Sequence, residues 1–263
     1  MTAGSIASNG FPRFALDGAT ALVTGAARGI GRATALALAD AGADVALGLR
    51  DADSADDVVE EIQAMGRRSM RVAMDVRDLG QVRGAVDAVV AELGRLDILV
   101  NNAGLGPANP AERVNEADYD LTFDVNVKGS FFASQAAGRV MIEQGHGRIV
   151  SISSQAGFVA LPTESVYCMS KAAIAHMTKC LAVEWGGYGI TVNAVAPTFI
   201  RTDGTAADLE DAAFAADVVE RIAAVHRIGE PMDVAGAVVF LASPAASLIS
   251  GTTLLVDGGW TAR

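Results

Sequence analysis

Short apolar runs alternate with longer amphipathic, alanine-rich stretches along the whole chain. The runs are five or six residues long and rich in Val, Leu and Ile, which is typical of buried strands, whereas the longer stretches repeat their apolar positions with the period of a helix. The predicted strands are residues 19–24, 44–49, 69–74, 96–101, 148–153, 190–195 and 253–257. The predicted helices are residues 29–41, 54–65, 79–93, a long helical region that ends near 143, 165–186 and several between 205 and 242.

Strands that alternate with helices predict βαβ units joined by right-handed crossovers. We therefore expect an α/β fold, a single Rossmann-like doubly wound domain with a seven-stranded parallel sheet flanked by helices. The chain has no linker, low-complexity block or internal repeat, so residues 15–263 are predicted to form one domain behind a flexible N-terminal tail, residues 1–14. The least regular segment, 198–230, is a candidate substrate lid at the carboxyl ends of the strands.

Composition and charge exclude several classes of partner. The chain has 263 residues, of which 51% are hydrophobic and only 5% aromatic, so the core must consist mainly of Ala, Val, Leu and Ile. A net charge of −11 argues against nucleic acids and anionic membranes as partners. No apolar run is long enough to span a bilayer, and the N-terminus lacks the pattern of a signal peptide. Two cysteines, Cys168 and Cys180, cannot form a disulfide framework, and we expect a cytoplasmic protein.

A glycine-rich turn follows the first predicted strand and begins the first helix, Thr24-Gly25-Ala26-Ala27-Arg28-Gly29-Ile30-Gly31. In such a turn Gly25 permits a tight bend, Gly29 lets the backbone approach a pyrophosphate, and Gly31 lets helix and strand pack closely. The helix N-terminus adds free N–H groups and the positive end of its dipole. A turn without a ligand is the alternative, but a strand before the glycines and a helix after them favour phosphate binding.

Tyr167 and Lys171 are four residues apart on a predicted helix and therefore share one face. A free tyrosine has a pKa near 10, and a cation held beside it stabilises the phenolate. The pair thus suits proton transfer to or from a carbonyl or alcohol oxygen. Taken alone, this spacing is more typical of an amphipathic Tyr beside a solvated Lys.

Three motifs in order, TGxxxGxG at 24–31, NNAG at 101–104 and Tyr167-x-x-x-Lys171, resemble those of the classical short-chain dehydrogenases/reductases. The resemblance covers essentially residues 18–260. It implies a dinucleotide-binding catalytic domain and an oxidoreductase that moves a hydride between nicotinamide C4 and a carbonyl or alcohol carbon. Tyr167 would be the acid/base, and Lys171 would tune it and hold the nicotinamide ribose.

The same resemblance assigns two further catalytic residues. Ser154, thirteen residues before Tyr167, would hydrogen-bond the substrate oxygen, whereas Ser151 and Ser153 lie at other spacings. Ser154 is not expected to be a nucleophile, because no histidine is placed to activate it; its role is that of an oxyanion-type donor. Asn126, 28 residues before Ser154, would hold a water that links the lysine to solvent; a buried hydrogen bond is the alternative.

The resemblance also implies cofactor contacts where the strands end. They are Asn102, Ala103 and Gly104 on the adenosine side, Asp75 and Val76 at the adenine ring, and Pro197, Ile200 and Thr202 at the carboxamide, in addition to Ile30 in the glycine turn. Thr198 stands where the family usually has a glycine. The three histidines match no metal-ligand spacing, so no metal is predicted.

Cofactor preference depends on the end of the second strand. An acidic residue there binds the adenosine ribose of NAD, whereas an arginine accommodates the 2′-phosphate of NADP. Leu49 occupies the place of the acid, Arg50 follows it, and Arg28 lies in the glycine turn. Guanidinium groups bind phosphate bidentately, so NADP(H) is favoured. NAD(H) stays possible, since a shift of one or two residues brings Asp51 to the ribose.

Two other functions compete with that of a dehydrogenase. A catalytically silent dinucleotide-binding sensor is disfavoured because Asn126, Ser154, Tyr167 and Lys171 are all present. In the related 3-oxoacyl-[acyl-carrier-protein] reductases two arginines contact the acidic carrier protein. Gly145 and Tyr188 occupy those positions here, and the charge of −11 would repel such a partner. A small, diffusible sugar, polyol or hydroxy-ketone is therefore expected.

Oligomeric state is implied by the resemblance alone. Family members commonly pair the long helices that carry the catalytic Asn and Tyr, together with the last strand. The helix that follows Tyr167 is rich in Ala and Met, which suits close helix packing. A homotetramer is expected, with a dimer as the alternative.

Overall fold

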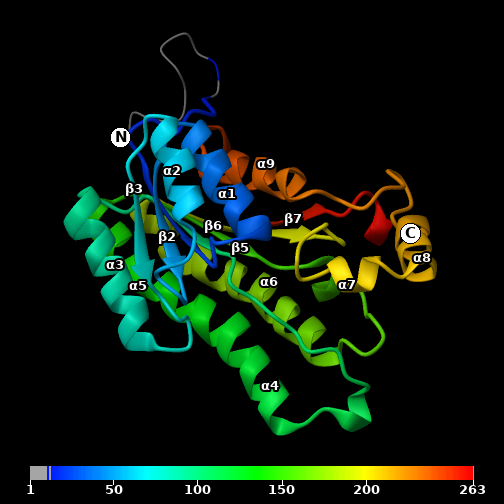
Figure 1. Cartoon of the computed structure of the whole chain (residues 1–263). Helices are drawn as coiled ribbons and strands as arrows, with labels where there is room; N and C mark the ends of the chain where they lie inside the picture. The colour runs from blue at the N-terminus through cyan, green and yellow to red at the C-terminus, as the bar shows by residue number, and fades with distance from the viewer. Residues whose placement is uncertain (1–10, 12, 263) are drawn as a thin grey trace.

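The computed structural model describes residues 11 and 13–262, so most of the predicted tail lies outside the described residues. The described chain contains one seven-stranded parallel sheet with the order β3-β2-β1-β4-β5-β6-β7 (Figure 1). Its strands are β1 Thr20–Thr24, β2 Asp44–Leu49, β3 Ser69–Ala73, β4 Ile98–Asn101, β5 Gly147–Ile152, β6 Ile190–Pro197 and β7 Thr253–Val256. The prediction of a doubly wound parallel sheet is confirmed.

Helices cover both faces of this sheet (Figure 1). One layer contains α1, α2 and α9, and the other contains α3, α5 and α6. The bounds are α1 Gly29–Asp40, α2 Asp56–Ala64, α3 Leu79–Leu93, α4 Glu116–Phe123, α5 Ser130–Gln144, α6 Ser165–Trp185, α7 Ala206–Leu209, α8 Ala212–Arg221 and α9 Pro231–Ala242. None of the helices in the described part of the chain is long and apolar enough to cross a membrane.

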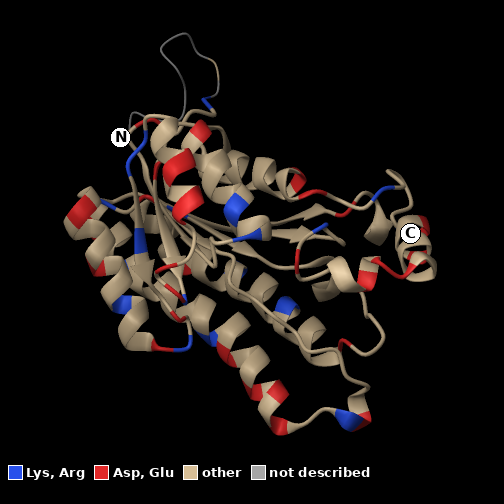
Figure 2. Cartoon of the chain, viewed as in Figure 1, with Lys and Arg blue, Asp and Glu red and all other residues tan. Residues whose placement is uncertain are grey.

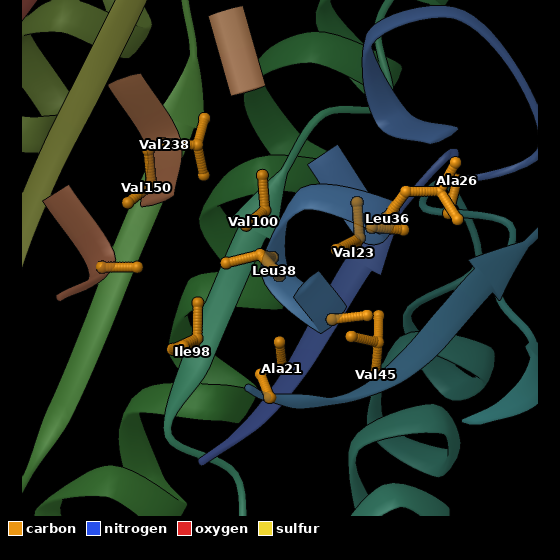
Figure 3. Close-up of a cluster of buried hydrophobic side chains, with 14 of the residues drawn as sticks. Ala21, Val23, Ala26, Leu36, Leu38, Val45, Ile98, Val100, Val150 and Val238 are labelled. Atoms are coloured by element: carbon orange, nitrogen blue, oxygen red, sulfur yellow. The ribbon is translucent and has the colours of Figure 1, made fainter. Parts of the chain in front are cut away.

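The central strands are buried on both faces, which explains why they read as continuous apolar runs. In β1, Ala21 and Val23 join the core beneath α1 and α9 (Figure 3), whereas Leu22 joins the core beneath α3, α5 and α6. Neighbouring strands repeat this alternation: Val45 faces the first core and Ala46 the second. The charged residues lie mainly on helices and loops (Figure 2).

Most predicted strands and helices agree with the structure to within two residues, which is the usual uncertainty of element ends. The long helical region before residue 144 differs in kind. It is α4, a π-helical turn at Asp124–Gly129, and then α5. Near the N-terminus, Arg13 and Phe14 contact the rest of the domain. The Arg13 carbonyl accepts a hydrogen bond from Ala245 N at 2.9 Å, and the centre of the Phe14 ring lies 6.3 Å from that of Phe240.

Because every strand is parallel, all carboxyl ends meet at one edge of the sheet, where ligands bind in open α/β folds. The glycine turn follows β1, residues 102–106 follow β4, Ser154 follows β5, and residues 198–202 follow β6. The segment after β6 continues through α7 and α8, and Ile200 forms a β-bridge with Gly229 where it returns. This edge therefore collects the predicted site.

Candidate active site

The glycine turn is fastened to the end of β4 by hydrogen bonds. The Thr24 hydroxyl oxygen accepts from the backbone N–H groups of Asn102 and Ala103, each at 3.0 Å. In return, Asn102 Nδ2 donates to the carbonyls of Thr24 at 2.9 Å and Gly25 at 3.1 Å. A Cβ at Gly31 would lie 2.3 Å from the Gly25 carbonyl oxygen, so only glycine fits there. Predicted residues from two strand ends thus form one cluster.

The backbone of this turn leaves the first turn of α1 open to a ligand. Gly25 and Gly29 have φ of 65° and 54°, in the left-handed region that favours glycine. Arg28, at the N-cap of α1, provides no side-chain hydrogen bond to the N–H groups of that turn. Free N–H groups at a helix N-terminus suit a phosphate. The turn therefore fits the pyrophosphate of a dinucleotide, and Ile30 packs inward against the core beside it.

The end of β2 presents an apolar residue followed by a base. Leu49 is buried, and Arg50 and Arg28 are exposed. Asp51 turns into its own loop, where a carboxylate oxygen accepts from Asp53 N at 3.1 Å. The residue that ends β2 thus supplies no carboxylate, whereas two guanidinium groups lie on the segments that follow β1 and β2.

The end of β3 carries an ion pair. Asp75 is half-buried, and its carboxylate lies 2.6 Å from Arg77 Nη2. The hydrogen bond from Arg77, with a smaller contribution from the charge of Arg50, holds the pKa of Asp75 below its usual value although burial opposes it. The next residue, Val76, touches the end of the π-helical turn, since a Cβ at Gly129 would lie 2.8 Å from the Val76 Cβ.

Asn126 lies within the π-helical turn and is almost completely buried. Its Oδ1 accepts from Leu105 N at 2.9 Å, and its Nδ2 donates to Leu105 O at 2.8 Å and Ser170 Oγ at 2.9 Å. The side chain thereby joins the loop after β4 to helix α6. Single π-helical turns occur frequently at functional sites, and apolar periodicity gives no signal for this one.

Lys171 is buried, with 4% of its surface exposed. Its Nζ donates to Ile152 O at 2.9 Å and lies 5.4 Å from the centre of the Tyr167 ring. A Cβ at Gly104 would lie 3.2 Å from Lys171 Nζ and 3.4 Å from Asn126 Oδ1, so Gly104 lets the loop lie against both groups. Burial lowers the pKa of Lys171 to about 8.

Tyr167 is half-buried beside Lys171, one turn earlier on α6. Burial raises the pKa of Tyr167 to about 12, a hydrogen bond with Ser154 acts in the opposite direction, and the charge of Glu164 raises it further. A Cβ at Gly106 would lie 2.5 Å from the tyrosine ring, so this position requires glycine. Gly106 was not among the predicted residues; its only signal is its place two residues after the NNAG motif.

The three candidate serines have different partners. Ser153 Oγ donates to Lys171 O of α6 at 2.9 Å, and Ser151 Oγ accepts from Asn101 Nδ2 of β4 at 3.2 Å, so both hydrogen bonds join neighbouring elements of the fold. Ser154 lies two residues beyond the end of β5, where its Oγ caps a short 3-10 helix by accepting from Ala156 N at 3.1 Å. Only this serine contributes to the Tyr167 pKa.

The segment after β6 lies against the glycine turn. Pro197 is the buried last residue of β6, and a Cβ at Gly29 would lie 3.3 Å from the Thr202 methyl group. Thr198 has no left-handed backbone conformation, and its N–H donates to Val256 O at 3.2 Å. The threonine is therefore accommodated where relatives have glycine. Ile200 is buried beneath this segment.

The candidate lid segment, residues 198–230, packs through a cluster of aromatic residues. Phe199 lies 5.6 Å from Trp260 and 5.5 Å from Phe214 of α8, measured between ring centres. Val218 of α8 and Ile222, the residue after α8, are buried with Trp260 in this cluster. Trp260, near the end of the chain, thus packs against the segment that follows β6. Nothing in its local sequence indicated this contact, because it joins segments far apart in the chain.

Comparison with known proteins gives similarity along almost the whole chain. A protein-family model described as enoyl-(acyl carrier protein) reductase matches residues 25–261. D-threitol dehydrogenase from Mycolicibacterium smegmatis is 42% identical over 253 residues, which are 95% of this chain and 95% of that protein. The 3-oxoacyl-acyl-carrier-protein reductase of Staphylococcus aureus is 42% identical over 241 residues, 91% of this chain and 97% of that protein.

A solved structure is also similar to this chain along almost its whole length. Gluconate 5-dehydrogenase from Burkholderia cenocepacia, in complex with NADP and tartrate, has a TM-score of 0.92 and 38% identity to this chain. The match covers 95% of this chain and 98% of that one. All of the predicted site residues, from Gly25 to Thr202, lie within the region that the family model matches.

Proposed function

Because the chain belongs to the short-chain dehydrogenase/reductase family of oxidoreductases, we propose that it transfers a hydride between a nicotinamide dinucleotide and the CH–OH carbon of a small sugar, polyol or hydroxy-ketone. One observation carries this proposal. Ser154, Tyr167 and Lys171 lie at the same edge of the sheet as the N-terminus of α1, which has no side-chain cap and suits a phosphate. Asn126 borders Gly104 together with Lys171.

The nicotinamide, when bound, supplies the hydride chemistry. The chain supplies the proton: the Tyr167 hydroxyl gives it to, or takes it from, the substrate oxygen, and Ser154 donates a hydrogen bond to that same oxygen. Burial keeps the Tyr167 pKa near 12 in the protein alone. The Lys171 ammonium, 5.4 Å from the ring centre, favours the phenolate by its charge.

Lys171 and Asn126 are proposed to return the proton to solvent. The buried Lys171 has a pKa of about 8 and so exchanges protons near neutral pH. Asn126 Oδ1 and Lys171 Nζ both border Gly104, each within 3.4 Å of the point where a Cβ on that glycine would lie. A water held by Asn126 would link the ammonium to solvent, and the same ammonium would hold the nicotinamide ribose.

A small substrate is favoured over an acyl carrier protein. The two positions that bear arginines in the carrier-protein reductases are Gly145 and Tyr188 here, and Tyr188 is half exposed. They belong to one surface, since a Cβ at the neighbouring Gly189 would lie 2.5 Å from Gly145 O. A glycine and a tyrosine offer no cation to an acidic partner.

NADP(H) is the proposed cofactor, with NAD(H) as the alternative. Arg50 and Arg28 are exposed on the turns that follow β2 and β1, and Leu49 leaves no carboxylate to repel a 2′-phosphate. Asp75 and Val76 would border the adenine ring. The bound NADP of the related gluconate 5-dehydrogenase supports this choice.

A homotetramer is the proposed assembly, with a dimer as the alternative. β7 is an edge strand of the sheet, and its Leu254 and Leu255 are 36% and 39% exposed. Val183 and Met169 on α6 are 85% and 47% exposed. Exposed apolar residues on an edge strand and a helix face favour burial in an interface. Light scattering should give four times the mass of the chain.

The decisive experiment replaces Tyr167 with Phe and measures turnover of polyols, ketoses and hydroxy-ketones with each cofactor. Loss of the proton donor should lower kcat by about 1000-fold or more, because general acid–base catalysis contributes about this much. Cofactor binding, measured by fluorescence titration, should stay within a few-fold of the native protein. Unchanged turnover in the Tyr167→Phe variant would refute the proposed role.

A further inference from the structure

Ser170 is a buried hydroxyl group among the predicted catalytic residues that the proposed chemistry does not use. It lies on α6 between Tyr167 and Lys171 and is completely buried. Its Oγ donates to the Tyr167 carbonyl oxygen at 2.8 Å and accepts from Asn126 Nδ2 at 2.9 Å. Ser170 therefore joins the π-helical turn that carries Asn126 to the part of α6 that carries the tyrosine and the lysine.

Three hydrogen bonds hold the Asn126 amide, and they join it to two different elements. Two of them involve the backbone of Leu105, in the loop after β4, and decide which end of the amide faces that loop. The third joins the amide to Ser170 on α6. Because the Ser170 hydroxyl donates its single proton to the Tyr167 carbonyl, its oxygen acts as an acceptor and matches the NH2 group of the amide. The position of the amide relative to α6 thus depends on Ser170.

This position matters because the proposed proton relay spans the two elements. Asn126 Oδ1 and Lys171 Nζ lie within 3.4 Å of the point where a Cβ on Gly104 would be. A water between them would accept a hydrogen bond from the ammonium and donate one to Oδ1, which has two lone pairs and receives only Leu105 N among the described residues. Hydrogen bonds weaken steeply when their distance or angle departs from the optimum. A shift of the amide relative to α6 would therefore break this link.

A second serine makes the same pair of hydrogen bonds in another part of the fold. Ser134 of α5 is completely buried, its Oγ donates to Ser130 O at 2.7 Å, and it accepts from Asn101 Nδ2 at 2.9 Å. Ser134 and Ser170 thus have the same burial and the same kinds of partner. They differ in the asparagine that they hold, since Asn101 lies in β4 and is not one of the predicted catalytic residues.

On the premise of the proposed function, we infer that Ser170 is a positioning residue: its hydrogen bond holds the Asn126 amide where one water can link it to Lys171. Without the hydroxyl, one N–H of a buried amide has no acceptor. No other hydrogen bond of that amide reaches α6 in the described part of the chain. The amide would then follow the loop after β4, and the return of the proton to solvent would slow. In this role Ser170 acts through Asn126 alone.

The test compares Ser170→Ala with Ser134→Ala, because each removes one buried hydroxyl with the same kinds of partner. Both variants should lose similar stability in urea unfolding, but only Ser170→Ala should lower kcat for the best polyol, by about tenfold, with KM within a few-fold of native. The solvent deuterium isotope effect on kcat should rise in Ser170→Ala, because proton transfer becomes the slow step. Partial loss of folded protein would not change that ratio. A Ser170→Ala variant with the kcat and isotope effect of Ser134→Ala overturns the inference.

A double-mutant cycle shows whether Ser170 acts through Asn126. The variant with both Ser170→Ala and Asn126→Ala should have the kcat of Asn126→Ala to within about twofold, because the second change removes a support that no longer holds anything. Two losses that multiply would show an independent role and overturn the inference. Ser170→Cys keeps a weak donor and acceptor, so its kcat should lie between those of the native enzyme and Ser170→Ala. It gives the same comparison if Ser170→Ala folds poorly.

Hydrogen exchange of the side-chain amide separates this inference from the proposed function, because it requires no substrate. In protein labelled with 15N at asparagine, the Nδ2 signal of Asn126 is the one that Asn126→Ala removes. Its exchange with solvent should be about tenfold faster in Ser170→Ala, whereas Ser134→Ala should affect Asn101 instead. This result in a protein that turns over no polyol supports the hold of Ser170 on Asn126, and the failure then belongs to the proposed reaction. Unchanged exchange in Ser170→Ala overturns the inference.

Discussion

The nucleotide side of the site and the lid side are held together by different forces. Around the glycine turn, Thr24 and Asn102 make four hydrogen bonds with backbone groups, and Gly31 has no room for even a methyl group. The lid segment is held by ring contacts of Phe199 and Trp260 and by ion pairs at the surface. The glycine turn is held by hydrogen bonds to specific backbone atoms, whereas the lid segment is held by contacts between side chains.

This difference indicates that the glycine turn serves cofactor binding and that the lid segment serves substrate selection. Surface ion pairs contribute little to stability, and apolar side chains of similar volume substitute for one another at small cost. The outer part of the candidate lid segment, α7 and α8, can therefore change its side chains with little effect on the glycine turn, whereas Thr202 packs against Gly29. Changes in α7 and α8 should alter which substrate binds rather than which cofactor.

The largest expected effect comes from Gly31→Ala, which attacks the rigid side. The new Cβ would lie 2.3 Å from the Gly25 carbonyl oxygen and 2.5 Å from Asn102 Nδ2, so the turn must move. We expect the dissociation constant for NADP(H) to rise by about 100-fold or more, as overpacking against backbone costs about 3 kcal/mol. Fluorescence titration measures this. Gly84→Ala, where a Cβ meets nothing within 4 Å, is the control.

Gly106→Ala should impair catalysis without impairing cofactor binding. Its Cβ would lie 2.5 Å from the Tyr167 ring, so the tyrosine must shift. We expect kcat to fall by about 100-fold, the usual consequence of displacing a catalytic group by about 1 Å. The affinity for NADP(H) should be nearly unchanged. Equal losses in kcat and cofactor affinity would show that the two regions are coupled rather than independent.

Lys171→Met tests the cost of keeping a cation between the two regions. Burial lowers the pKa of Lys171 to about 8 in the folded protein, so the unfolded chain binds the proton more tightly. Below pH 8 the buried charge of Lys171 therefore lowers the free energy of unfolding by its full amount. This destabilisation disappears as the pH rises from 8 toward the pKa of lysine in the unfolded chain. We expect the variant to be inactive but about 2 kcal/mol more stable at pH 7, after allowance for the lost hydrogen bond to Ile152 O.

Urea unfolding of the cofactor-free proteins at pH 7 and pH 10 measures this difference. The advantage of Lys171→Met should be smaller at pH 10. An advantage that is absent at pH 7, or that grows with pH, would contradict a buried lysine whose pKa is lowered by desolvation.

The smallest effect is expected for Arg50→Ala, at the outer end of the nucleotide side. Arg50 is exposed, so its removal should leave the fold and kcat unaltered. We expect kcat/KM with NADP(H) to fall about tenfold, as befits one charged contact with a phosphate, and kcat/KM with NAD(H) to stay the same. A native preference for NAD(H), or no change with NADP(H), would contradict the role proposed for the end of β2.

Sequence alone predicted the parallel sheet and the glycine turn, because both depend on local patterns: apolar runs of strand length and glycines at fixed spacing. It did not predict the π-helical turn around Asn126, since a single extra residue per turn leaves the apolar pattern almost intact. It also missed Gly106 and Trp260. Each of these acts through contacts between segments distant in the chain, which periodicity does not report.

Direct hydride transfer to the cofactor is tested by following the hydride itself. The polyol that the enzyme oxidises fastest is prepared with deuterium on the carbinol carbon and incubated with the enzyme and NADP+. We expect one deuterium on the nicotinamide ring of each reduced cofactor, detected by mass spectrometry, and none with Tyr167→Phe over the same time. Deuterium released to water, or reduced cofactor without the label, would contradict direct hydride transfer at this site.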